Sequence, residues 1–185
     1  MVRVPDIPFE QLTDAQRRVF RKIAKTRNGH VRGPFGLWIR NPELADRASE
    51  FGNALRVHGK LNKRLFELTV LLVARHWSAQ YEWSVHEHPA LEAGVSREIV
   101  EAIRAGRAPS FVKQDEKLIF DIVSQINEKC EVNQATYDRA VAELGVDLLI
   151  ELVTAVGFYT TIAMVVTIFD APVPEGEPPL PQIGN

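Results

Sequence analysis

The succession of residues that begin and end helices constrains the fold of this chain most. Polar residues that accept hydrogen bonds at helix starts recur along the chain, and glycines follow at helix-length intervals. The predicted capping residues are Thr13, Asn41, Asn62, Ser78, Ser96, Asn133 and Asp147. No stretch shows the sustained alternation of apolar and polar residues that is typical of β-strands. The sequence therefore predicts an all-α fold, a bundle of about eight helices.

The expected helices differ in how much of their surface is apolar. They should cover residues 13–25, 42–58, 63–76, 78–93, 96–105, 113–129, 133–145 and 147–169. The helix at 63–76 has almost no polar face, so it should be central. Residues 26–41 combine three glycines and a proline with apolar residues such as Phe35 and Trp38. We expect a loop there, with its apolar side chains tucked in to wall a pocket.

The length of the chain is typical of one domain. With 185 residues, 45% of them hydrophobic, the chain can bury a sizeable core. We assign residues 1–170 to a single domain. Residues 171–185 contain five prolines and should form an extended tail.

The charge balance narrows the partners and the location that we expect. A formal net charge of -2 gives no broad basic surface for nucleic acid or an anionic membrane.

The first residues lack the apolar core of a secretory signal, so a cytoplasmic location is expected. Residues 152–169 are uncharged, but four threonines and Gly157 lie among them. We interpret this segment as a helix buried in the core or between subunits, not as a membrane span.

Glu67, Glu82 and His86 are the residues most suited to chemistry. Glu67 falls inside the most apolar helix, where a carboxyl group is costly unless it has a partner. It therefore either acts as an acid or base or only ties helices together. Glu82 and His86 are four residues apart, so they share a helix face. Because His86 and His88 diverge on a helix and no HExxH pattern occurs, we expect no metal.

The spacing of these residues matches a known motif. In the carboxymuconolactone decarboxylase and AhpD-like family the motif runs E, eleven residues, C-x-x-C, three residues, H. The segment 62–106 resembles it: Glu67 and His86 occupy the glutamate and histidine positions, while Ala79 and Glu82 replace the two cysteines. The runs at 64–75 and 93–106 also resemble the family.

The missing cysteines decide which branch of the family the chain resembles. Only Cys130 remains, so a dithiol that reduces peroxides cannot form. The resemblance implies the decarboxylase-like branch, whose E-W-x-x-H form appears as Glu82, Trp83 and His86. Enzymes of that branch decarboxylate a carboxylated muconolactone in aromatic catabolism without a cofactor. The resemblance also implies a homo-oligomer, a trimer or hexamer.

Roles for the individual residues follow as a hypothesis. His86 would donate a proton, Glu82 would set its protonation, and Glu67 would act as a relay or positioning carboxyl group. The candidate substrate-binding residues are Arg75 and Arg40 for a carboxylate, and Tyr81, Trp83 and Trp38 for the walls. A related lactone or enolisable acid would suit the same groups. The alternatives are a non-catalytic AhpD-like oligomeric protein and an alkylhydroperoxidase-related antioxidant protein.

Overall fold

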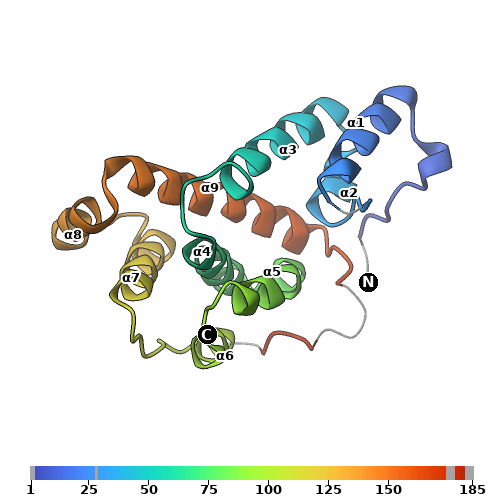
Figure 1. The fold of residues 1–185 in the computed structure, drawn as a ribbon. Helices are drawn as coiled ribbons and strands as arrows, with labels where there is room; N and C mark the ends of the chain where they lie inside the picture. The colour runs from blue at the N-terminus through green and yellow to red at the C-terminus, as the bar shows by residue number, and fades with distance from the viewer. Residues whose placement is uncertain (1–2, 28, 174–177, 182–185) are drawn as a thin grey trace.

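The structure is a computed structural model that describes residues 3–27, 29–173 and 178–181. Within these ranges the chain forms nine α-helices, one short 3-10 helix and no β-strand (Figure 1). The elements are the 3-10 helix Phe9–Gln11, α1 Asp14–Lys25, α2 Pro34–Trp38, α3 Pro42–Arg56, α4 Lys63–His76, α5 Gln80–Glu92, α6 Arg97–Arg104, α7 Gln114–Lys129, α8 Gln134–Leu144 and α9 Val146–Ile168. The predicted all-α fold is confirmed, with one helix more than expected.

Five of the predicted caps are confirmed by hydrogen bonds at helix starts. Thr13 accepts a hydrogen bond from the backbone N–H of Gln16, whose side chain bonds back to the Thr13 N–H. The other four side chains each accept from a backbone N–H in the first turn of α3, α4, α6 or α8, and they are Asn41, Asn62, Ser96 and Asn133. Local chemistry therefore determines where most helices begin.

Two predicted caps were wrong. Ser78 adopts a φ of +48° in the turn after α4, and α5 begins after Ala79 without a side-chain cap. Gly145 precedes α9, so Asp147 lies inside the first turn, where its charge suits the helix dipole. In both places the turn that ends the preceding helix determines where the next helix begins.

The loop predicted at 26–41 was also partly wrong, because Pro34–Trp38 form the short helix α2. Gly33 has a φ of +60° and turns the chain, and Pro34 then occupies the first helical turn, where its missing N–H costs nothing. As expected, Phe35 and Trp38 are buried, and their rings meet edge to face. This short helix brings the segment before α3 onto α9.

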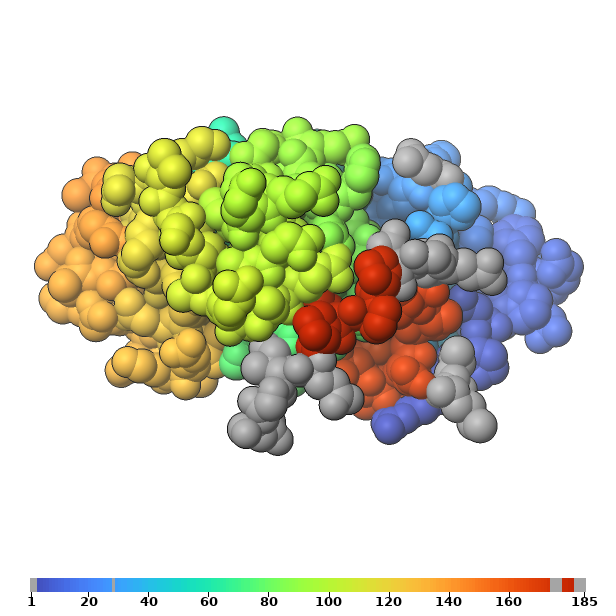
Figure 2. All heavy atoms as spheres, turned by 90° about the horizontal axis from the view of Figure 1, so that it is seen from below, coloured from blue at the N-terminus to red at the C-terminus, as the bar shows by residue number. Residues whose placement is uncertain are grey.

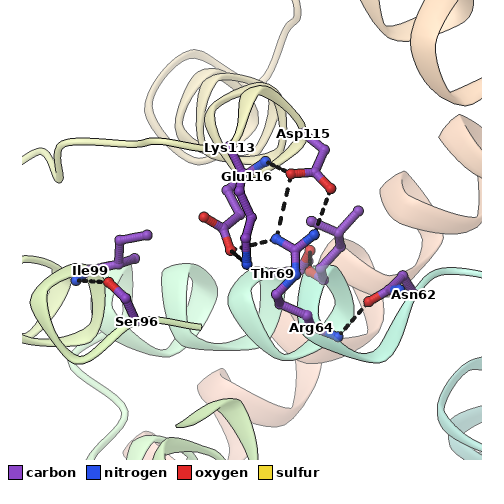
Figure 3. Close-up of polar contacts among 9 residues, drawn as sticks. Asn62, Arg64, Thr69, Ser96, Ile99, Lys113, Asp115 and Glu116 are labelled. Carbon is purple, nitrogen blue, oxygen red and sulfur yellow. Dashed lines mark hydrogen bonds and ion pairs between the residues drawn. The ribbon is translucent and has the colours of Figure 1, made fainter. Parts of the chain in front are cut away.

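Helix α4 is the centre of the fold, as its sequence predicts. Eleven consecutive residues, 65–75, are buried, and the helix packs against α5, α7 and α9 (Figure 1). At its first turn, Arg64 bonds both Asp115, with Nη2 2.6 Å from Oδ2, and the buried Glu116 of α7 (Figure 3). This network ties α7 to the central helix.

Helix α9 contacts α2, α3, α4, α5 and α8. By length and composition it could cross a membrane, but half of its most apolar stretch is buried inside the fold. A core helix meets the same criterion. Residues 178–181 lie against α4 and α5 of the same chain (Figure 2). There the carbonyl oxygens of Pro178 and Pro181 accept hydrogen bonds from Gln80 and Arg75.

Candidate active site

A buried chain of three side chains joins α4 to α5. His86 Nδ1 lies 2.7 Å from Glu67 Oε2, and His86 Nε2 lies 3.0 Å from Glu82 Oε1. All three residues are almost fully buried. Two ring nitrogens facing two carboxylates favour an imidazolium that donates both N–H groups. The geometry thus brings together the three residues that the sequence singled out.

The electrostatics of His86 follow from these contacts. Burial alone would lower the pKa of its ring, but the hydrogen bonds that the ring donates to Glu67 and Glu82 outweigh burial and raise the pKa to about 9. The ring of Tyr159 on α9 packs edge-on against the imidazole, with centroids 5.3 Å apart. These contacts favour a protonated ring that donates both of its N–H groups at neutral pH.

A pocket of about 280 Å³ opens beside the linked side chains of Glu82 and His86. It lies between the end of α1, the α2 segment, α3, α5 and α9. Its lining residues are Thr26, Arg27, His30, Arg32, Pro34, Phe35, Gly52, Arg56, Tyr81, Glu82, Val85, His86, Phe158, Tyr159 and Ile162. Its volume lies just below the usual range of about 300–1,000 Å³ for small-molecule sites, so it suits a small ligand.

Two tyrosines contribute neutral hydroxyl groups to the pocket. Burial raises the pKa of Tyr81 to about 12, and Glu82 adds to the shift. Burial and the nearby Glu82 and Glu67 also raise the pKa of Tyr159 well above its ordinary value. Both groups therefore keep their protons at neutral pH and can donate hydrogen bonds.

Gly33 lets Tyr81 take its place in the pocket wall. A Cβ atom built on Gly33 would lie 2.2 Å from Tyr81 Cζ, far inside contact distance. Its φ of +60° also disfavours any other residue. The glycine before α2 is thus required by both the turn and the tyrosine.

Glu67 lies on the other side of His86 from this pocket. It lines a second hollow of about 520 Å³ together with residues of the α3–α4 connection. Glu82 and His86 line the first pocket, whereas Glu67 does not. The three-residue chain therefore connects two hollows through the core. Arg56 lines both of them.

The predicted substrate-binding residues are only partly brought together. Tyr81 lines the pocket, but Arg40, Arg75, Trp83 and Trp38 do not. Arg40 and Arg75 donate to the carbonyl oxygens of Pro5 and Pro181, in contacts that tie down chain segments. Trp83 is buried and donates its indole N–H to Glu87, while Trp38 packs on Phe35.

Sequence reasoning missed the cationic side of the pocket. Arg27, Arg32 and Arg56 line it from three separate segments, and no described carboxylate forms an ion pair with any of them. No spacing pattern links these positions, because only the tertiary fold brings them together. The sequence held only a weaker signal than a spacing pattern for these arginines. Arg27 and Arg32 lie close to glycines in a segment that was already expected to wall a pocket.

The remaining candidates lie elsewhere. Cys130 is exposed at the end of α7 and does not line the pocket. The exposed His88 pairs with Glu92, and its Nδ1 lies 3.6 Å from Glu92 Oε1. Within the described ranges no group of His, Cys, Asp and Glu residues has the arrangement of a metal site. In the buried chain both His86 nitrogens already face carboxylates.

Comparison with known families gives one match. Residues 42–114 match the carboxymuconolactone decarboxylase family. The matched segment includes α3, α4, α5 and α6, and with them Glu67, Glu82 and His86. No curated protein matches the chain.

Proposed function

We propose that this chain, whose residues 42–114 match the carboxymuconolactone decarboxylase family, is a decarboxylase-like lyase. Its substrate would be a small carboxylated lactone or a related enolisable acid, and the reaction would proceed by proton transfer without a cofactor. The observation that carries the proposal is the buried Glu67–His86–Glu82 chain, which reaches a pocket of small-molecule size. A network that served only packing would not need that pocket.

The reaction consists of two events, loss of carbon dioxide and protonation of the carbon next to the lactone carbonyl. The bond to the carboxylate breaks, carbon dioxide leaves, and the electron pair moves into conjugation with the lactone carbonyl. A proton then adds to the resulting enolate and gives the product. The His86 imidazolium stabilises the developing negative charge and supplies that proton.

The path of the proton follows from the hydrogen bonds. His86 Nε2–H donates to Glu82 Oε1 at 3.0 Å, and both residues line the pocket. Because both ring N–H groups bond carboxylates, the proton would reach the substrate through Glu82. Glu67, bonded to the opposite ring nitrogen, balances the charge and holds the ring in place. Because Glu67 lines the second hollow, it can return a proton to His86 from that side.

The test is turnover of chemically prepared carboxymuconolactone by the purified protein, followed by ultraviolet absorbance and carbon dioxide release. His86→Asn removes the proton donor and should lower kcat by about 100-fold or more. The matched control is His88→Asn, because His88 lies on the same helix but is exposed and outside the pocket. It should retain native turnover.

The outcomes separate the proposed enzyme from its alternatives. Loss of turnover in His86→Asn alone supports the proposal. Equal turnover in both variants would sink the assignment of His86. An absence of turnover on this and related lactones would favour the non-catalytic family member, in which the three residues only tie α4 to α5.

A further inference from the structure

Two guanidinium groups meet at one wall of the pocket. Arg56 of α3 donates through Nη2 to the carbonyl oxygen of Thr26, at 3.3 Å, which places it beside Arg27. Both arginines line the pocket. No carboxylate in the part of the chain that the structure describes pairs with either of them. Two adjacent cations that form no ion pair need an explanation, since the charge of Glu82 acts on Arg27 only from a longer distance.

Arg27 is held in place although its hydrogen-bonding capacity is not used. Its guanidinium carbon lies 3.9 Å from the centre of the Phe35 ring, a stacked position that restrains the planar group. Its Nη1 is buried and has no hydrogen-bond partner among the described residues. Burial, and then the charge of Arg56, lowers the pKa of Arg27 to about 10. The group remains charged at neutral pH, and its burial is unfavourable for the folded protein by itself.

We propose that Arg27 and Arg56 form an anion-binding subsite, which takes the carboxylate of a small substrate with an apolar body. The proposal rests on the proposed function for the reaction, but it concerns binding and can be tested without turnover. A planar guanidinium donates two parallel hydrogen bonds to a carboxylate, and the unused Nη1 is one such donor. The rings of Phe35 and Phe158 line the space for an apolar body.

The other charges around the pocket support this orientation. Glu82 also lines the pocket, and its charge repels a carboxylate placed beside it, so the anionic end of a ligand is directed to the arginines. Arg40 and Arg75 lie outside the pocket, where each donates to one backbone carbonyl. Nε and Nη1 of Arg75 are also buried without a hydrogen-bond partner among the described residues, but Arg75 does not line the pocket. The whole chain carries a net charge of -2, so the attraction for an anion is local to this wall.

The experiment measures binding of 2-furoate and its neutral counterpart 2-furamide to the full-length protein by NMR titration. The two probes share ring and size and differ in charge. The native protein should bind furoate about tenfold more tightly than furamide, as expected for charged hydrogen bonds. Arg27→Met should remove this preference while its side chain still packs on Phe35, and Arg56→Met should weaken it. The control is Arg18→Met, at an exposed position of α1, which should leave both affinities unchanged.

Equal affinity for the two probes in the native protein would overturn the subsite. So would an undiminished preference for furoate in both Arg27→Met and Arg56→Met, with circular dichroism confirming that at least one of them is folded. The reaction and the subsite can fail separately. Furoate preference that depends on Arg27 without lactone turnover would contradict only the reaction. Turnover by Arg27→Met with an unchanged KM would contradict only the subsite.

Discussion

At the scale of single residues, the surroundings of His86 decide what it can do. A neutral imidazole between two carboxylates would leave one carboxylate facing an acceptor nitrogen, which is unfavourable in a buried site. The charged ring satisfies both partners, and its pKa of about 9 expresses that preference. The same pair of carboxylates thus holds the ring in position and favours its protonated form.

We expect Glu67→Gln to lower the pKa of His86, because the variant removes one of the charges that favour the imidazolium. A pKa above the unfolded value of about 6.5 stabilises the folded state fully below that pH, and the contribution disappears as pH rises through 9. The native protein should therefore exceed Glu67→Gln in unfolding free energy by about 3 kcal/mol at pH 6, and by less at pH 10. NMR titration of the ring and denaturant unfolding at both pH values measure these effects.

Glu92→Gln is the matched control, since it removes the carboxylate partner of the exposed His88 on the same helix. It should leave the titration of His86 unchanged. A His86 that titrates near pH 6.5 in the native protein would contradict the proposed role of its two partners.

How far the sequence predicts the site depends on whether residues are linked through local spacing. Glu82 and His86 are one helical turn apart, so their contact could be predicted from the chain alone. Glu67 required the family motif, since its contact with His86 crosses two helices. Arg27 and Arg56 carry no such signal, because a shared pocket wall depends on how α2 and α3 pack on α9.

At the scale of elements, the turn before α2 shapes the pocket through a glycine. Gly33→Ala should destabilise the protein by about 2 kcal/mol, because alanine resists the left-handed backbone and its Cβ would collide with the Tyr81 ring. Thermal unfolding and denaturant titration measure the loss. Binding of 2-furamide should also weaken, since Tyr81 lines the pocket.

Gly157→Ala provides the comparison for this substitution. Gly157 lies inside α9, and nothing lies within 4 Å of a Cβ built on it. Alanine there should stabilise the protein by about 0.5–1 kcal/mol. If both substitutions changed stability equally, the close approach of Gly33 and Tyr81 would not be the cause.

The helix starts also show where capping residues alone do not predict the structure. Asn41 and Asn62 cap their helices because the backbone N–H groups of a first helical turn have no partner within the helix. The asparagine side chain that precedes the turn accepts a hydrogen bond from one of them. Ser78 carries the same signal, yet it lies in the left-handed turn that closes α4. Helix α2 was missed because five residues give too short a pattern beside so many glycines and prolines.

At the scale of the whole molecule, α9 connects the pocket to an exposed surface. Tyr159 and Phe158 reach the pocket from one side of the helix. Val146, Ile150 and Val153 lie exposed at spacings of four and three, which places them together on another side. We expect an apolar stripe of this kind on a long helix to serve as a surface for association.

We expect this stripe to join copies of the chain into the homo-oligomer that the family resemblance implies. Ile150→Glu places a charge at a residue that is 61% exposed in the single chain, so it should be tolerated by the fold but disrupt association. Sedimentation velocity at micromolar concentration would show the native protein as an oligomer and this variant as a smaller species. Val112→Glu is the control, because Val112 is 95% exposed and lies before α7, away from α9. A native protein that sediments as a single chain would contradict the expectation, and binding to lipid vesicles would point to a membrane partner for the same stripe.

Since α9 also carries Tyr159, association on its outer side would brace the pocket, and the Ile150→Glu variant should bind 2-furamide less tightly than the Val112→Glu control.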